Sequence, residues 1–263
     1  MGLTLSSSGH AYGMPLKSNV RRQNLPMRTL ISTTVVLVLA TACAAPVPKA
    51  ATDNVRGKNF TAPAVGALIV LLPPPQAKKV EAGESFMAAQ LGAQLQAAGY
   101  RVATLTRPNY NEIWSQEVAA VGGVFDQTTG ASKAEAYALA LSNLARRVCD
   151  EAKCVMVIQQ RLVPRTARLD GSVVNWDGQS RSVPVKNAHT REFRFSGTTT
   201  ALSVELLAVM ANGGMGFRTY GGASLPFQTD VQESVNELRP NLFSNDQEVA
   251  DGVRIALQPL LGK

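Results

Sequence analysis

The stretch VGALIVLL at residues 65–72, followed by Pro73, Pro74 and Pro75, decides the fold. It is an uninterrupted apolar run of strand length, and a strand without polar alternation is typical of a sheet buried on both faces. Proline has no N–H to donate to a neighbouring strand, so the run must end at Pro73. The sequence therefore predicts that a folded domain begins at Val65 with a central strand.

A strand–helix–strand unit follows from this start. A helix is predicted from about Glu84 to Ala98, because Met87, Leu91 and Leu95 fall on one helical face. The next strand is predicted over residues 100–105. Two strands joined by a helix within about 40 residues are typical of a βαβ unit with a right-handed crossover.

A second helix leads to a second buried strand. Ser132 and Glu135 form a capping box that opens a helix to about Asp150. The apolar run Cys154–Ile158 then reads as a strand, while residues 107–130 are less decided and are expected to hold at most a short helix.

The second half of the chain alternates in the manner of antiparallel strands. Asp170-Gly171 and Asp177-Gly178 are hairpin turn signals, and Thr200 to Met210 alternates clearly before a partner strand at Met215–Tyr220. Two helices are predicted after Pro226, at Val231–Leu238 and from Ser244 to the C-terminus. The fold class is α/β (α+β): a mixed sheet of about five or six strands, helices packed on one face, and an antiparallel meander in the second half.

The N-terminal region carries an export pattern. Arg28, the apolar run 30–42 and the small residues before Cys43 describe a secretory leader too short to span a bilayer. The stretch resembles a bacterial lipoprotein signal, although Ala40 stands where that signal usually has leucine. The resemblance implies that Cys43 is lipidated and becomes the first residue of the processed chain. The alternative is an ordinary cleaved signal in which Cys43 is incidental.

This pattern divides the chain into three parts. Residues 1–42 are the N-terminal extension and signal peptide, with Met14 and Met27 both plausible starts; residues 43–64 are a Pro- and Ala-rich flexible tether; and residues 65–263 form a single periplasmic α/β domain. Four basic and no acidic residues precede Cys43, so processing lowers the net charge from +7 to +3. Nucleic-acid binding therefore loses its compositional argument.

The other two cysteines, Cys149 and Cys154, are a candidate disulfide. In one continuous helix, residues five apart lie too far apart to bond, so a disulfide requires the helix to end between them. Two buried thiols are the alternative. No second Cys or His cluster accompanies the pair, so a zinc site is not expected.

The order of elements resembles a group of periplasmic lipoprotein domains. The group includes the curli-secretion-channel type, the activator lipoproteins of penicillin-binding proteins and the amino-terminal domain of the Tol-system β-propeller protein. The resemblance rests on the segments 68–75, 99–105 and 154–160 and covers roughly residues 66–220. In such lipoproteins a residue other than aspartate after the lipidated cysteine accompanies outer-membrane sorting, and Ala44 holds that place here.

One charge asymmetry is a candidate partner surface. Residues 159–195 contain seven basic and three acidic side chains. A basic face could bind an envelope protein, an acidic glycan or a lipid phosphate; solvated arginines on the outside of a meander are the alternative. Trp176 is either a partner contact or a core residue. The candidate partner contacts are Trp176, Arg161, Arg165, Arg168 and Arg181.

Motifs for catalysis are missing from the sequence. His189 is the single histidine after Cys43, and there is no Gly-x-Ser-x-Gly, HExxH or P-loop motif. We expect no enzyme activity, no cofactor and no metal site, and an exposed loop for His189.

These observations favour a lipoprotein of a Gram-negative outer membrane. It would face the periplasm, held by the lipid on Cys43, and act as a binding or scaffold module in envelope assembly. An envelope enzyme acting on glycan or lipid is one alternative, and a homo-oligomeric ring component of a secretion or assembly system is another.

Overall fold

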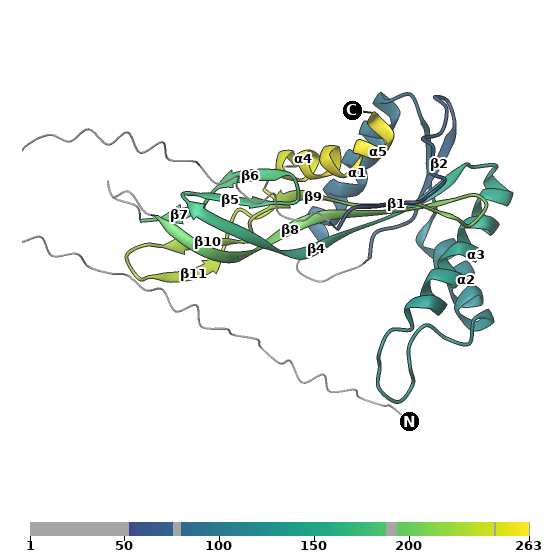
Figure 1. Cartoon of the computed structure of the whole chain (residues 1–263), viewed down its shortest axis with the longest axis horizontal. Helices are drawn as coiled ribbons and strands as arrows, with labels where there is room; N and C mark the ends of the chain where they lie inside the picture. The colour runs from purple at the N-terminus through teal and green to yellow at the C-terminus, as the bar shows by residue number, and fades with distance from the viewer. Residues whose placement is uncertain (1–52, 76–79, 188–193, 245, 263) are drawn as a thin grey trace, which may run out of the picture. The chain divides into compact units, whose positions relative to one another are not determined.

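A computed structural model describes residues 53–75, 80–187, 194–244 and 246–262 (Figure 1). The signal peptide, Cys43 and His189 lie outside the described residues. Among the residues described, no helix has the length and apolar composition needed to cross a bilayer. In chain order the elements are β1 Val55–Arg56, β2 Leu68–Leu71, α1 Glu81–Ala97, β3 Arg101–Thr104, α2 Arg107–Ala120, α3 Ala134–Ala152, β4 Met156–Gly171, β5 Val173–Trp176, β6 Gln179–Ser182, β7 Val185–Lys186, β8 Phe195–Met210, β9 Met215–Ser224, β10 Phe227–Asp230, β11 Val235–Leu238, α4 Gln247–Ala256 and α5 Gln258–Leu261.

The predicted central strand is β2, which lies between β3 and β4 and is parallel to both. Ile69 and Leu71 belong to one hydrophobic core, and Val70 and Leu72 belong to another on the opposite face. The uninterrupted apolar run is therefore explained by burial on both sides. The α/β (α+β) class with a mixed sheet is confirmed.

Helices cover both faces of the sheet, not one. Helices α1, α4 and α5 pack in the core that contains Ile69, whereas α2 and α3 pack in the core that contains Val70. The main sheet has eight strands and a further sheet has three, more than the five or six expected. The second face is covered because residues 107–120, left undecided by the sequence, form the full helix α2, which lies there with α3.

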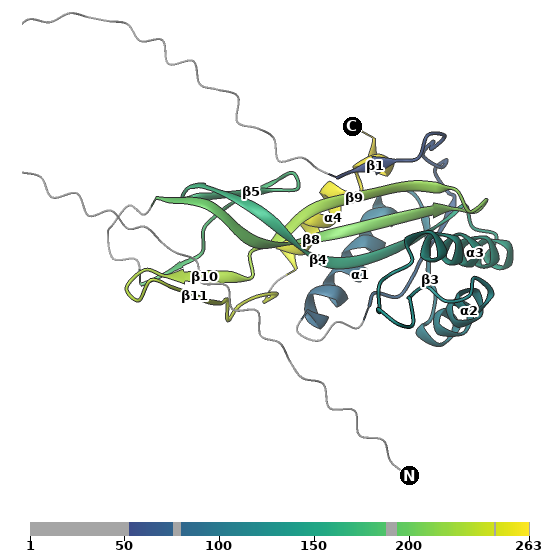
Figure 2. The ribbon, with the colours of Figure 1, turned by 60° about the horizontal axis from the view of Figure 1, so that its bottom comes forward.

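Two sixteen-residue strands dominate the second half. Strand β4 pairs antiparallel with β8 along its whole length, from Met156 opposite Met210 to Gly171 opposite Phe195, and β9 continues the meander. Helices α2 and α3 lie at one end of these strands, and β5, β10 and β11 lie at the other (Figures 1 and 2). The strands thus extend beyond the cover of α2 and α3.

The tether reaches the domain earlier than predicted. Val55 and Arg56 pair with β9, and the Phe60 side chain is only 8% exposed, in edge-to-face contact with Phe217. Residues 53–64, assigned to the tether from their composition, are therefore part of the domain. The segment shows no periodic pattern of apolar residues because a single aromatic side chain, Phe60, anchors it.

The helix predicted at Val231–Leu238 is wrong. The Asp230 carboxylate accepts hydrogen bonds from the backbone N–H groups of Gln232 and Glu233, which turns the chain, and β11 then pairs with β10. Val235 and Leu238 are 47% and 60% exposed. Their helical spacing therefore does not correspond to a buried face.

The two cysteines of the domain are bonded to each other. Helix α3 ends at Ala152, Lys153 adopts a left-handed conformation, and the Cα atoms of Cys149 and Cys154 come within 4.4 Å. The helix ends between the cysteines, as a disulfide requires. Of the two alternatives, the structure has the disulfide.

We predict that the contact between α4 and β9 tolerates no added side-chain carbon. A Cβ on Gly221 would lie 1.9 Å from the carbonyl oxygen of Gly252, whereas a Cβ on Gly92 of α1 would meet nothing within 4 Å. Gly221→Ala should lower the free energy of unfolding by about 3 kcal/mol, because backbone must move. Gly92→Ala should raise it by about 0.5 kcal/mol, because alanine favours a helix. Urea denaturation of both variants checks this, and equal effects would contradict the described packing.

Candidate functional site

A group of charged side chains occupies the part of the sheet that α2 and α3 leave uncovered. Register places Arg161 of β4 opposite Glu205 of β8, and Glu205 opposite Tyr220 of β9. Partners across antiparallel strands share a face, so the three side chains lie in a row. We call the group the arginine face, and its members are Arg161, Arg165, Asp177, Glu205, Arg218 and Tyr220.

Glu205 is the centre of this face. Its carboxylate accepts hydrogen bonds from Arg161 Nε, from Arg218 Nε at 2.6 Å and from the Tyr220 hydroxyl at 3.0 Å. The Glu205 side chain is 2% exposed, whereas those of Arg161 and Arg218 are 45% and 43% exposed. One buried carboxylate therefore fixes two half-exposed guanidinium groups.

The electrostatics keep Glu205 charged. Burial acts to raise its pKa, but the hydrogen bonds and positive charges of Arg161 and Arg218 outweigh burial, so that the pKa lies below the ordinary value of 4.5. The hydrogen bond to Glu205 in turn raises the pKa of Arg161. Glu205 and Arg161 are therefore both ionised at neutral pH.

A second set of ion pairs continues the face toward the N-terminal segment. Arg165 donates from Nε to Asp177 at 3.0 Å and from both Nη atoms to Asp53 at 3.1 Å, and its guanidinium lies 4.3 Å from the centre of the Tyr220 ring. Ser203 donates to Asp177 at 2.7 Å. Asp53 is 68% exposed, while Asp177 is 5% exposed. The start of the domain is thus docked beside the arginine face.

The structure brings together only two of the four arginines singled out from the sequence. Arg161 and Arg165 lie on the arginine face, but Arg168 is even-numbered on β4 and points to the other side of the strand, where it is exposed. Arg181 pairs with Asp251 of α4 at 3.1 Å. The predicted basic surface is therefore divided between separate places.

Trp176 is a core residue, the second of its two alternatives. Its side chain is 2% exposed and donates from Nε1 to the carbonyl oxygen of Leu202 at 3.2 Å. It packs with Ala167, Val174, Ala201 and Leu225. Trp176 is therefore not available for contact with a partner.

Sequence reasoning missed Glu205, Arg218 and Tyr220. Their proximity depends on the register of three strands, which no local pattern specifies. One signal was present: Glu205 is the single charged residue between Ala201 and Met210. A lone carboxylate in an apolar strand needs a cation beside it, because burying an unpaired charge is costly.

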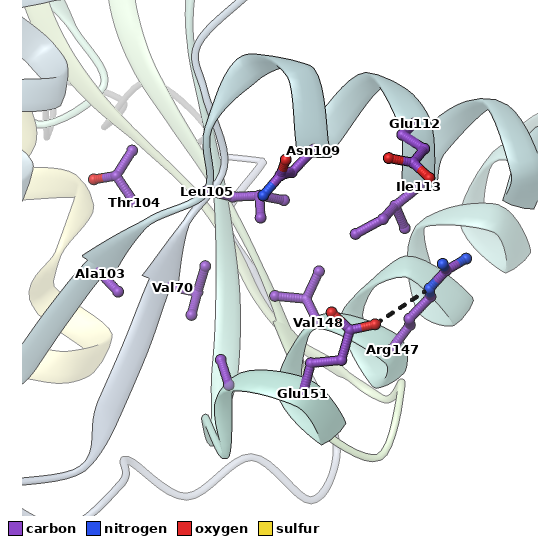
Figure 3. A pocket seen from close by; sticks show the side chains of 11 residues that line it. Val70, Ala103, Thr104, Leu105, Asn109, Glu112, Ile113, Arg147, Val148 and Glu151 are labelled. Carbon is purple, nitrogen blue, oxygen red and sulfur yellow. Dashed lines mark ion pairs between the residues drawn. The ribbon is translucent and has the colours of Figure 1, made fainter.

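A groove beside the edge strand β3 is a second candidate site (Figure 3). It has a volume of about 400 Å³, and Figure 3 shows Arg147 and Glu151 of α3 joined by an ion pair at its rim. Its apolar lining is Val70, Ala103, Leu105, Ile113 and Val148. Arg147 also donates from Nη1 to Gln116, whereas Arg161 and Arg218 bond Glu205 through Nε alone, so the groove is a weaker candidate for charged ligands than the arginine face.

A metal centre finds no support in the described part of the chain. There, no three His, Cys, Asp or Glu side chains lie close enough together to hold a metal ion. The carboxylates of the arginine face are all used as acceptors for arginine. The chemistry that this arrangement offers is recognition of anionic groups by guanidinium.

Comparison with known proteins identifies no family. No protein-family model and no curated protein matches the chain. Among solved structures it is similar to PelC dodecamers from Paraburkholderia phytofirmans. One, a variant with a leucine-to-methionine substitution, has 10% identity, covers 80% of this chain and 98% of its own, and has a TM-score of 0.35. The other has 11% identity, covers 81% and 98%, and has a TM-score of 0.34. These values are too low to assign the chain to that family.

The lowered pKa of Glu205 predicts a pH-dependent contribution to stability. A carboxyl whose pKa is lower in the folded state stabilises the fold above its unfolded pKa, and the stabilisation is lost as pH falls through the folded pKa. Glu205→Gln should lower the free energy of unfolding by about 2 kcal/mol at pH 7, since charge-assisted hydrogen bonds are lost. The difference from the parent should shrink below about pH 4.5, where Glu205 begins to take up its proton in the unfolded chain.

Urea denaturation between pH 7 and pH 3 measures this difference. Glu135→Gln is the matched control, since Glu135 is an exposed residue of the first turn of α3. It should change stability by less than about 0.5 kcal/mol at every pH. A constant difference for Glu205→Gln across the pH range would contradict the assignment.

Proposed function

We propose that the protein is a lipid-anchored lipoprotein of the outer membrane, facing the periplasm, and that it acts as a non-enzymatic binding or scaffold module in envelope assembly. The observation that carries the binding role is the arginine face: half-exposed guanidinium groups held in place by buried carboxylates on an uncovered half of the sheet. The anchor rests on the leader and Cys43.

The disulfide supports export from the cytoplasm. Disulfides persist in oxidising compartments such as the bacterial periplasm and are rare in the cytosol. The Cys149–Cys154 bond closes the end of α3 against the beginning of β4. The bond therefore fits the compartment that the leader implies.

The docked N-terminal segment supports a short tether. Asp53, which contacts Arg165, is ten positions after Cys43 in the chain. A chain of ten residues spans at most about 35 Å. If Cys43 carries the lipid, Asp53 at the Arg165 end of the arginine face can lie no farther than that from the membrane surface. Tethering would raise the effective concentration of the face toward partners at that surface.

Self-association is a second candidate, favoured by the edge of the sheet. Strand β3 is the terminal strand of the main sheet, and Arg101, Ala103 and Thr104 are exposed. An unprotected edge strand is a template for pairing with another chain. A ring would use this edge and leave the arginine face free.

Two substitutions test the anchor and its sorting. Cys43→Ala should abolish incorporation of labelled palmitate and release the protein from the membrane fraction, because the acylated thiol is missing. Ala44→Asp should keep the label but move the protein to the inner membrane. Fractionation of cells expressing each variant is the measurement. Retention of Cys43→Ala in the outer membrane would contradict the proposed anchor.

A further inference from the structure

Arg161 and Arg218 each leave one side of the guanidinium group available. Both contact Glu205 through Nε. Within the described residues, no carboxylate or carbonyl oxygen accepts a hydrogen bond from their Nη atoms. Each residue therefore presents the two Nη groups, with four N–H donors, toward solvent. The two sets are held on either side of one carboxylate.

The local charge is one positive unit. Arg161 and Arg218 contribute two positive charges and Glu205 one negative charge. The neighbouring set of Arg165, Asp177 and Asp53 sums to one negative charge. The two sets adjoin at Tyr220, because the guanidinium groups of Arg165 and Arg218 lie 4.3 Å and 5.5 Å from the centre of its ring. The Nη atoms of Arg165 are bonded to Asp53 and Asp177, so the donors left for a ligand are those of Arg161 and Arg218.

We propose that the Arg161–Arg218 pair binds the singly charged oxyanion of a phosphodiester. The two arginines outnumber Glu205 by one positive charge, and their Nη donors have no acceptor among the described residues. A phosphodiester has two non-ester oxygens, one for each guanidinium group, and the planar guanidinium of arginine is the side chain best suited to phosphate recognition. Glu205 acts as a positioning residue that keeps both guanidinium groups in place before the ligand arrives.

The source of the phosphodiester is the headgroup of a phospholipid at the membrane surface. This step rests on the proposed anchor, because the short tether holds Asp53, at the Arg165 end of the same face, within about 35 Å of the bilayer. A soluble phosphodiester has the same chemistry, so binding to vesicles and binding in solution must be measured separately. Anionic lipid surfaces attract basic side chains at about 1 kcal/mol per residue near the surface.

The test uses the processed chain from residue 43 with Cys43→Ser, so that neither the leader nor an acyl chain adds membrane affinity. The three hydrophobic clusters lie within residues 60–260, so this chain retains its cores. Flotation with vesicles of phosphatidylglycerol in phosphatidylcholine, at physiological salt, measures binding. Phosphatidylcholine vesicles and soluble glycerophosphoglycerol are the comparison ligands.

Arg218→Lys is the decisive variant, because it keeps the net charge but removes the planar guanidinium group with its two Nη donors. It should weaken binding to phosphatidylglycerol vesicles about tenfold, since lysine is a point charge without bidentate geometry. The triple variant Arg161→Gln/Glu205→Gln/Arg218→Gln avoids a buried unpaired carboxylate and should abolish binding. Arg168→Gln removes an exposed arginine on the other side of β4 and should change binding less than twofold.

Equal binding by the parent and Arg218→Lys would overturn the proposal, because bulk charge alone would then explain it. Binding of soluble glycerophosphoglycerol as tight as that of vesicles would overturn the headgroup assignment. The assay contains no lipidated protein, so its result is independent of the Cys43→Ala fractionation. A failed anchor and a failed phosphodiester site are therefore distinguishable.

Discussion

The buried carboxylate of Glu205 is the constraint on which the open half of the sheet depends. A charge 2% exposed in the middle of β8 requires cations on both neighbouring strands, and Arg161 and Arg218 supply them. This requirement favours the observed register of β4, β8 and β9, since a shift of one residue would turn Glu205 to the other face. The same interaction explains why this region needs no covering helix: its surface is polar and its charges are paired.

The sequence predicted the architecture correctly where burial imposes a local pattern of apolar residues. The run from Leu68 to Leu72 indicated a strand with two buried faces, and the facing residues of α1 and α3 predicted both helices. Failures occurred where one side chain overrides the pattern. Phe60 docks a segment of tether-like composition, and Asp230 starts a turn in a stretch with helical spacing. The helical cover of the second face was missed in part because α2, which lies there with α3, buries little: Ile113 is the one residue of that helix that is buried.

Only part of the arginine face could be predicted from the sequence, and the reason is different. Arg161 and Arg165 share a strand and an alternation, so a local charge count finds them. Glu205, Arg218 and Asp53 come from three other segments of the chain and meet only through strand pairing. Conversely, Arg181 was counted with the basic surface but is paired with Asp251, which the sequence places 70 residues away. The number of charged residues in a segment predicts a binding surface poorly, because strand register decides which of those charges are paired.

In-cell photo-crosslinking tests most directly whether the arginine face is the binding surface. Val163 lies between Arg161 and Arg165 on the same side of β4, and Gln96 is exposed on α1. A photo-crosslinking amino acid at position 163 should give discrete adducts with envelope lipid or one envelope protein, and the same amino acid at position 96 should give none. Equal adducts from both positions, or only a ladder at multiples of the chain's own mass, would contradict the account.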